Sequence, residues 1–295
     1  MTFLKNITHS RYFKASVVVI FFLSSFLAWI GVHIYGNYYL STNNAYVNAN
    51  VVQIAPRVTG AVARLMIANN QFVKKDDLLF AIDSLPFQLS INSAQAELDV
   101  AEAELENATI TDQRIINLVK RKYLSPQDKD NSIAHFKIAQ SKVEYAKAKL
   151  AQAILSLDYT KILAPASGWI ANLTLRTGDI VLANQPLFAL ISDSEFWVDA
   201  NFKETELADI KPGQAATITI DMYPDHPFDG VVESISGGAG TAFSLLPPQN
   251  ATGNWVKVTQ RVPVRIHVLN PNPHFPLRIG TTASVTIKLH EQRNL

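Results

Sequence analysis

The sequence predicts a mixed α+β protein with four parts: an N-terminal transmembrane helix, a β-sandwich split in two, an antiparallel α-helical coiled-coil hairpin, and a C-terminal small β-barrel. Three observations lead to this fold class. Residues 15–35 form an uncharged apolar run, two similar β-like stretches occur at residues 55–83 and 164–192, and heptad patterns fill the interval between those stretches. A chain of 295 residues is long enough for such a multidomain arrangement.

Composition excludes several functional classes. The 26 basic and 25 acidic side chains leave a net charge of +1, so the charge balance gives no reason to expect a nucleic-acid partner. Cysteine is absent, which removes disulfides, thiol nucleophiles and thiolate metal sites. The seven histidines form no H-E-x-x-H motif and no pair four residues apart. The sequence therefore predicts no catalytic residue, no cofactor site and no metal site, and the protein is not expected to be an enzyme.

Residues 15–35 are predicted to form a single transmembrane helix, because at ~1.5 Å per residue they span the ~30 Å hydrocarbon layer. A cleaved signal peptide is the alternative, but its apolar core is usually only ~7–15 residues long and precedes a small-residue cleavage site. Lys5, Arg11 and Lys14 precede the run, whereas the next basic residue is Arg57. This asymmetry places residues 1–14 in the cytoplasm and everything after the helix outside, beginning with a linker and first strand at residues 36–54.

The two β-like stretches form an interrupted repeat. After the first glycine the register holds without a gap. The aligned pairs are Gly60 with Gly168, Val62 with Ile170, Leu65 with Leu173, Val73 with Val181, and Leu79-Phe80 with Leu187-Phe188. Asn69-Asn70 and Thr177-Gly178 supply equivalent turns before the last strands. Since one copy is too small to bury its own face, residues 55–83 and 162–192 are predicted to pack as the halves of one sandwich.

This pair resembles the two halves of a lipoyl or biotinyl carrier domain, in which a lysine on the tight turn between the halves carries the cofactor. Here residues 84–161 replace that turn, and no lysine lies on a short hairpin joining the halves. The resemblance therefore implies the fold without the cofactor. A lipoyl or biotinyl carrier subunit remains the alternative function from another class.

Residues 84–161 are predicted to form the coiled-coil hairpin, because apolar or small residues recur in alternating steps of three and four. In the first arm these are Phe87, Ile91, Ala94, Leu98, Ala101, Leu105, Ala108, Ile115 and Val119, broken only at Asp112. In the second arm they are Phe136, Ala139, Val143, Ala146, Leu150, Ala153 and Leu157. Arms of ~33 residues give a rod of roughly 50 Å. The tip is expected at residues 124–128, with Pro126 ending the first helix and Ser125 capping the second.

The chain from residue 193 to residue 290 is β-rich and punctuated by Pro and Gly, which favours a small antiparallel barrel. Candidate strands cover residues 196–201, 215–220, 230–235, 254–259, 262–268 and 282–289. Residues 291–295 form a short tail.

A lipoyl-like domain split by a coiled-coil hairpin, downstream of one N-terminal anchor, resembles the HlyD-like periplasmic adaptor (membrane fusion protein) family. At the tip, Arg114, Leu118 and Ser125 match the R-x-x-x-L-x6-S pattern with which such adaptors engage TolC-type outer-membrane channels. The spacing is expected to place all three on one face of the first helix. The resemblance implies that they bind the channel. From the residues alone, a solvated charge, a core leucine and a helix cap remain the alternative.

Further segments resemble the EmrA-type branch of this family. They are TNNAYV at residues 42–47, NFKETE at 201–206, AFSLLP at 242–247, NATGNW at 250–255 and QRVPVR at 260–265. The resemblance implies a periplasmic adaptor of a tripartite multidrug or toxic-compound efflux pump, which links a proton-driven major facilitator transporter to a TolC-type channel. The alternative partners are an ABC exporter or an aromatic-acid efflux system of the AaeA kind. A membrane-anchored coiled-coil scaffold without transport is a further alternative.

The same reading has consequences for location and assembly. It implies a single-pass protein of the bacterial inner membrane whose bulk lies in the periplasm. One thin hairpin cannot seal a conduit, so several copies are expected to form a ring.

Overall fold

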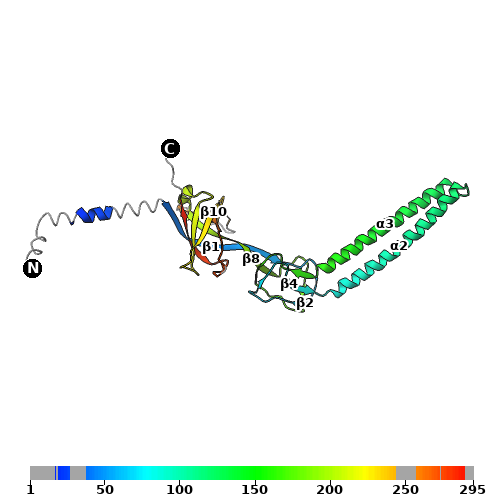
Figure 1. Cartoon of the computed structure of the whole chain (residues 1–295), viewed down its shortest axis with the longest axis horizontal. Coiled ribbons are helices and arrows are strands. Elements are labelled where there is room, and N and C mark those ends of the chain that lie inside the picture. Colours follow the sequence, from blue (N-terminus) through cyan, green and yellow to red (C-terminus); the bar gives the residue numbers. More distant parts are fainter. Residues whose placement is uncertain (1–16, 18, 27–37, 244–256, 273, 290–295) are drawn as a thin grey trace, which may run out of the picture. The chain divides into compact units, whose positions relative to one another are not determined.

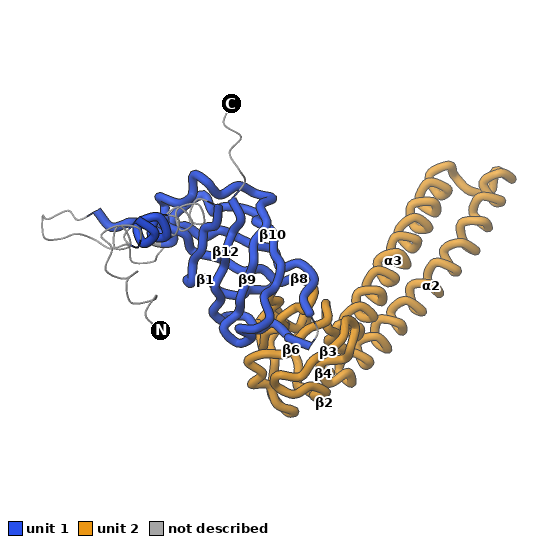
Figure 2. The backbone as a smooth tube through the Cα atoms, turned by 60° about the vertical axis from the view of Figure 1, so that its left-hand side comes forward, with its two compact units in different colours: residues 1–50, 195–295 blue, residues 51–194 orange. Residues whose placement is uncertain are grey.

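The computed structural model describes residues 17, 19–26, 38–243, 257–272 and 274–289 (Figure 1). The chain divides into two compact units (Figure 2). Unit 1 comprises residues 1–50 and 195–295, and unit 2 comprises residues 51–194. Two long strands, β1 (Tyr39–Ile54) and β8 (Phe188–Lys203), contribute residues to both units.

The predicted transmembrane helix falls mainly outside the described residues. Within residues 15–35, the structure describes positions 17 and 19–26, which are helical and carry exposed apolar side chains such as Phe21 and Phe22. None of the helices in the described ranges is both long enough and apolar enough to cross a membrane. The cytoplasmic assignment of residues 1–14 also concerns residues outside those ranges.

The β part of unit 2 consists of the two copies of the sequence repeat, and strands of one copy pair with strands of the other. The first half supplies β2 (Gly60–Leu65), β3 (Phe72–Val73) and β4 (Leu78–Ile82). The second half supplies β5 (Lys161–Leu163), β6 (Gly168–Ala171), β7 (Ile180–Val181) and the start of β8. Val73 pairs with Gly168 across β3 and β6, and Val181 pairs with Gly60 across β7 and β2. Equivalent strands thus exchange partners between the halves, which confirms the prediction of one domain built from both.

Burial in this domain follows the repeat. Val62 and its counterpart Ile170 are each 1% exposed, and Phe80 meets Phe188 edge to face at 6.1 Å between ring centroids. The predicted turns are present at equivalent places, where Asn70 and Gly178 have φ values of 63° and 93°. The side chains of both halves form a single apolar cluster, as expected if neither half can bury its face alone.

Gly168 is required by a close approach between strands. A Cβ atom there would overlap the carbonyl oxygen of Ile191 on the neighbouring strand β8. At the equivalent Gly60, a Cβ atom would lie 2.6 Å from Cγ2 of Ile82. The repeated glycines therefore permit a close approach between two strands within each half.

The insertion between the halves is an antiparallel helical hairpin of α2 (Leu85–Lys120) and α3 (Pro126–Asp158). Every residue predicted to line the seam between the arms is buried or half-buried, so the heptad prediction is confirmed. The interruption of the apolar pattern at Asp112 also appears in the structure. One carboxylate oxygen of Asp112 is buried without a hydrogen-bond partner among the described residues. The predicted end of the first arm at Pro126 is wrong, since α2 ends at Lys120.

Unit 1 is an antiparallel barrel in the strand order β1-β12-β9-β10-β11-β8, closed by pairing of β8 with β1. The remaining strands are β9 (Ala215–Ile220), β10 (Phe228–Ile235), β11 (Arg261–Val268) and β12 (Thr282–Lys288). Alternate residues of β8 face the core, where Val198, Ala200 and Phe202 are fully buried. A predicted strand at residues 254–259 is wrong for residues 257–259, which are irregular, while residues 254–256 lie outside the described ranges.

Candidate functional site

The first helix of the hairpin ends in a Schellman motif. The backbone N–H of Lys122 donates to the carbonyl of Val119 at 2.9 Å, and the N–H of Tyr123 donates to the carbonyl of Leu118 at 3.0 Å. Lys122 adopts the left-handed conformation, with φ of 61°, at a position that usually holds glycine. Because glycine is the usual residue at this position, the lysine gives no sign in the sequence that the helix ends here.

The second helix begins with a capping box. The side chain of Ser125 accepts a hydrogen bond from the backbone N–H of Asp128 at 3.3 Å, and the Asp128 carboxylate accepts from the backbone N–H of Ser125 at 3.0 Å. The Ser125 hydroxyl also donates to this carboxylate at 2.7 Å. These hydrogen bonds, with the hydroxyl contributing most, hold the pKa of Asp128 below its usual value. Both helix ends at the tip are therefore fixed by local hydrogen bonds.

The structure brings two of the three predicted channel-binding residues onto one helix. Arg114 and Leu118 lie one turn apart on α2; Arg114 is exposed and Leu118 is half-buried. Arg114 forms no ion pair with any residue in the described ranges. The expectation that Ser125 shares their helix face is wrong, because α2 stops before it and Ser125 is the N-cap of α3.

Sequence reasoning missed the two apolar residues between the helix caps. Tyr123 is 75% exposed and Leu124 is 37% exposed, in a turn held by the Schellman motif on one side and the capping box on the other. Lys120 and Arg121 beside them are exposed as well. The signal in the sequence is an aromatic residue directly after the basic run at residues 120–122 and shortly before Ser125-Pro126.

Below the tip, two ion pairs connect the arms on one edge of the hairpin. Lys142 Nζ lies 2.6 Å from the Glu104 carboxylate, and Lys149 Nζ lies 2.6 Å from the Glu97 carboxylate. The hydrogen bond that Lys149 donates to the Glu97 carboxylate raises the pKa of Lys149. Glu104 follows Glu97 by one heptad in α2, and Lys149 follows Lys142 by one heptad in α3. The two ion pairs therefore mark the register between the antiparallel arms.

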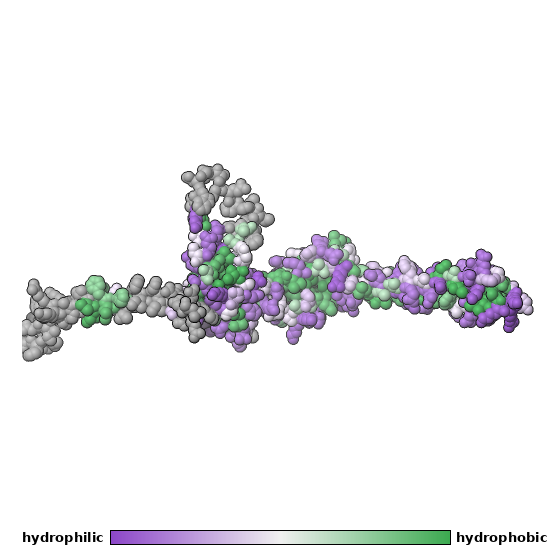
Figure 3. Space-filling view, turned by 90° about the horizontal axis from the view of Figure 1, so that it is seen from above, coloured by the Kyte–Doolittle hydropathy of each residue, from purple (hydrophilic) through white to green (hydrophobic). Residues whose placement is uncertain are grey.

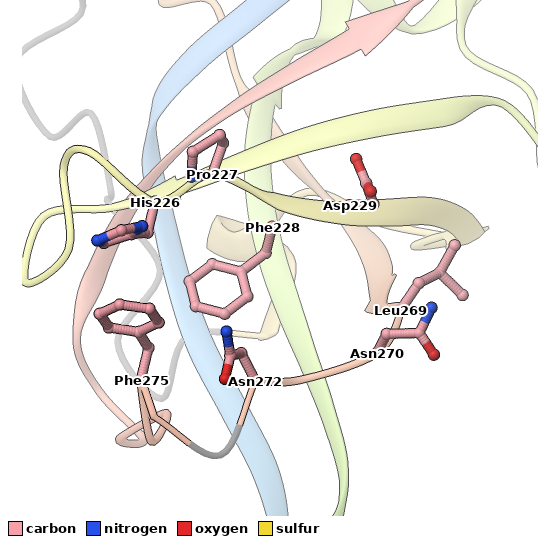
Figure 4. A pocket seen from close by; sticks show the side chains of 8 residues that line it. All are labelled: His226, Pro227, Phe228, Asp229, Leu269, Asn270, Asn272 and Phe275. Carbon is pink, nitrogen blue, oxygen red and sulfur yellow. The ribbon is translucent and has the colours of Figure 1, made fainter.

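The barrel carries a separate hollow of about 250 Å³ at one end (Figure 4). The His226 ring stacks on Phe275 with 4.0 Å between centroids, and the Asp229 carboxylate lies on the opposite side in the view of Figure 4. Its other lining residues are Pro227, Phe228, Leu269, Asn270 and Asn272. Among the described residues, no group of three His, Asp or Glu side chains could hold a metal ion.

Comparisons with known proteins agree with this architecture. Residues 50–193 match the family model of the barrel-sandwich hybrid domain of RND membrane fusion proteins, and residues 195–288 match the AAEA-like β-barrel domain. The chain is 33% identical to the multidrug export protein EmrA of Haemophilus influenzae, over 85% of this chain and 76% of that protein. It is 35% identical to the uncharacterized protein YdhJ of Escherichia coli, over 94% and 97% of the two chains.

A solved structure shares the fold. MacA from Actinobacillus actinomycetemcomitans aligns with a TM-score of 0.66 and 23% identity, over 86% of this chain and 80% of that chain. Together with the sequence matches, this establishes the class of protein. The chain belongs to the RND/HlyD-type membrane fusion (periplasmic adaptor) protein family, among its EmrA-like members. This family is non-enzymatic.

Proposed function

We propose that this chain is the periplasmic adaptor of a tripartite multidrug or toxic-compound efflux pump, which joins a proton-driven major facilitator transporter to a TolC-type outer-membrane channel. The EmrA-like relatives, one of which is named a multidrug export protein, support the efflux role. The absence of a P-loop motif in the sequence agrees with an adaptor whose partner supplies the energy.

In this proposal the segment at residues 15–35 anchors the chain in the inner membrane, with residues 1–14 in the cytoplasm. The positive-inside asymmetry supports this orientation, because Lys5, Arg11 and Lys14 all precede the apolar run. A reporter that is active only in the periplasm, fused after Leu295, is expected to be active while the chain stays in the membrane fraction. Recovery of a processed, soluble chain would contradict the anchor.

One observation carries the channel contact: the tip presents an exposed Arg114 that has no ion-pair partner among the described residues, one turn from Leu118, on a helix end fixed by hydrogen bonds. A guanidinium can donate two parallel hydrogen bonds to a carboxylate or to carbonyls of a partner. Leu118 supplies an apolar contact beside it, and Ser125 lies at the start of the next helix. A tip held in one geometry loses little conformational entropy when it docks.

The test is charge reversal at Arg114. Arg114→Asp alters an exposed helix position, so the free energy of unfolding should change by only about 0.5 kcal/mol. Efflux should nevertheless be lost, because the new carboxylate opposes the acceptor on the channel. Arg114→Lys keeps the charge without the planar fork and should give an intermediate defect. Resistance, membrane abundance and channel crosslinking are measured in cells for each variant.

The control is Arg176→Asp, the same charge reversal at an exposed position on the β domain of unit 2. Normal efflux by Arg114→Asp at normal abundance would refute the channel contact. An equal defect in Arg176→Asp would show that charge in general is responsible.

The identity of the transporter needs a separate experiment. Crosslinking in intact cells, followed by mass spectrometry of the bound proteins, is expected to recover a major facilitator transporter and a TolC-type channel. The match of residues 195–288 to an AAEA-like barrel keeps an aromatic-acid efflux system as the second candidate. Recovery of an ABC exporter, or a lysine carrying lipoyl or biotin mass, would contradict the proposal.

A further inference from the structure

The hairpin joins the β domain of unit 2 at its root, which we define as residues 82–87 and 157–161. Among the described elements, α2 and α3 contact chiefly each other along their length. In Figure 3 the hairpin is a narrow rod whose surface mixes hydrophilic and hydrophobic residues. The direction of this rod relative to the β domain therefore depends on the contacts at its root.

A small tilt at the root becomes a large displacement at the tip. The helix α2 has 36 residues, so it reaches about 54 Å at ~1.5 Å per residue. A tilt of about 10° would then move the tip by about 9 Å. Because packed helices lie about 8–10 Å apart, such a tilt displaces the tip by one whole helix of a partner. A rod that meets a partner at a fixed place therefore needs a fixed root.

The first arm is attached to the β domain through an aromatic side chain. Phe87, near the start of α2, is half-buried and packs on the apolar cluster of the β domain. Beside it, the backbone N–H of Ile82 donates to the carbonyl of Thr160 at 2.8 Å, which holds the two arms together where they leave the sheet. This hydrogen bond alone would still let both arms tilt together, and Phe87 opposes that tilt from the side of α2.

The second arm is attached through a cation–π contact. The guanidinium carbon of Arg57 lies 4.8 Å from the centroid of the Tyr159 ring, within the distance of about 6 Å at which such contacts form. Tyr159 is the C-cap of α3, whose last turn carries no basic residue. Arg57 therefore brings, from the β domain, the positive charge that favours a helix C-terminus. Arg57 forms no ion pair with any described residue.

The loop that carries Arg57 is itself fixed to the β domain on both sides. The carbonyl of Pro56 accepts a hydrogen bond from the backbone N–H of Asn184 at 2.8 Å. The hydroxyl of Thr59 accepts one from the backbone N–H of Ala183 at 3.0 Å. The guanidinium is thus presented to α3 from a backbone held in place on either side of it.

We propose that Arg57 and Tyr159 are a positioning pair that fixes the direction of the hairpin relative to the β domain of unit 2. Together with Phe87, the pair attaches each arm to the domain at a separate point. A tilt of the rod then has to disturb at least one of the two attachments. The importance of this direction for efflux rests on the proposed function, whereas the positioning of the hairpin does not.

The test measures a distance across the root in the full-length chain, which has no native cysteine. Spin labels are attached at Ala63→Cys on β2 and at Ala103→Cys on α2, both exposed positions. The labelled chain is diluted into the unlabelled parent, so that the measured pairs of labels lie within one copy. Pulsed electron paramagnetic resonance should give one narrow distance distribution. Arg57→Met and Tyr159→Ala should each broaden this distribution about twofold, because each removes the cation–π contact.

Two further variants serve as controls. Tyr159→Phe keeps the aromatic ring and should keep the narrow distribution. Arg265→Met removes a guanidinium that lies 4.6 Å from the ring of Trp197 in the barrel, and it should leave the distribution unchanged. All variants should keep the helix signal and the melting midpoint of the parent. An unchanged width in Arg57→Met and Tyr159→Ala, or equal broadening in Tyr159→Phe, would overturn the positioning pair.

Efflux measurements decide whether the fixed direction matters to the pump. At equal membrane abundance, Arg57→Met should lower resistance several-fold, whereas Tyr159→Phe should retain it. A broadened distance distribution with full resistance would overturn the role of the pair in efflux. A parent chain that confers no resistance would refute the proposed function, and the distance distributions would still decide whether the pair positions the hairpin.

Discussion

The β domain of unit 2 and the helical hairpin inserted into it are stabilised in different ways. The β domain buries large side chains completely, with Leu79, Phe80 and Leu190 at 0% exposure in a cluster drawn from both halves. The buried part of the hairpin seam is a narrow line of mostly alanine, where even Leu98 remains 8% exposed. The first arrangement resists substitution because close packing tolerates little change in volume. The second leaves most side chains on the surface, where partners can bind them.

The largest effect on stability is expected from Gly168→Val. A Cβ at this position overlaps the carbonyl oxygen of Ile191, so the strands must separate, and the loss should exceed about 4 kcal/mol. The control Gly178→Ala meets no neighbouring atom and should cost only about 1 kcal/mol, from its φ of 93°. Unfolding is followed by tryptophan fluorescence, because Trp169 adjoins Gly168. Equal midpoints for the two variants would contradict the close-approach argument.

The next effect compares the two regions directly. Leu190→Ala removes a fully buried side chain from the β domain and should cost about 4 kcal/mol, whereas Leu98→Ala in the hairpin should cost about 2 kcal/mol because a thin seam can close. Tryptophan fluorescence reports on the first variant, and circular dichroism at 222 nm reports on the second. If Leu98→Ala lost more unfolding free energy than Leu190→Ala, the hairpin seam would be more tightly packed than its exposure indicates.

A smaller change is expected at the tip. Ser125→Ala removes the hydroxyl that caps α3 and should lower the stability of the helices by about 1 kcal/mol. Ser125→Asn keeps a side-chain acceptor at the cap and should restore the helix signal. If Ser125→Asn restores the helix signal but lacks efflux, the hydroxyl itself contacts the partner. If Ser125→Ala melts like the parent, the cap does not stabilise the tip.

The stability of the tip should also fall at low pH. Because folding lowers the pKa of Asp128, its contribution is present above the unfolded pKa and is lost as the pH falls through the folded pKa. The hairpin melting temperature of the parent should therefore approach that of Asp128→Ala as the pH falls below about 3.9. A difference between the two that stays constant over this range would exclude the carboxylate as its source.

The smallest effect on the β domain is expected from removing the rod. Deleting residues 89–156 and joining the ends with a short flexible turn keeps Phe87, which packs on the apolar cluster of this domain. The shortened chain should unfold cooperatively by tryptophan fluorescence, at nearly the midpoint of the parent, while efflux is lost. A molten or insoluble product would show that the hairpin belongs to the core.

Much of this architecture could be predicted because burial leaves periodic marks in sequence. Val62 and Ile170, or Val73 and Val181, occupy equivalent buried positions, and the repeat exposes that equivalence directly. The end of α2 could not be predicted, since the left-handed residue there is Lys122 and not glycine. At the candidate site, Arg114 and Leu118 were singled out by their resemblance to the R-x-x-x-L-x6-S pattern of the adaptor family. Tyr123 was not, because its exposure depends on the turn made by the left-handed Lys122, and lysine is not a residue type that usually ends a helix.

The pairing of β4 with β5 makes the length of the rod independent of the domain that carries it. Ala81 pairs with Lys161, and the N–H of Ile82 donates to the carbonyl of Thr160 at 2.8 Å, so the chain leaves and re-enters the sheet on adjacent strands. One heptad added to each arm would lengthen the rod by about 10 Å without altering that pairing. The same β domain can therefore carry a hairpin of another length.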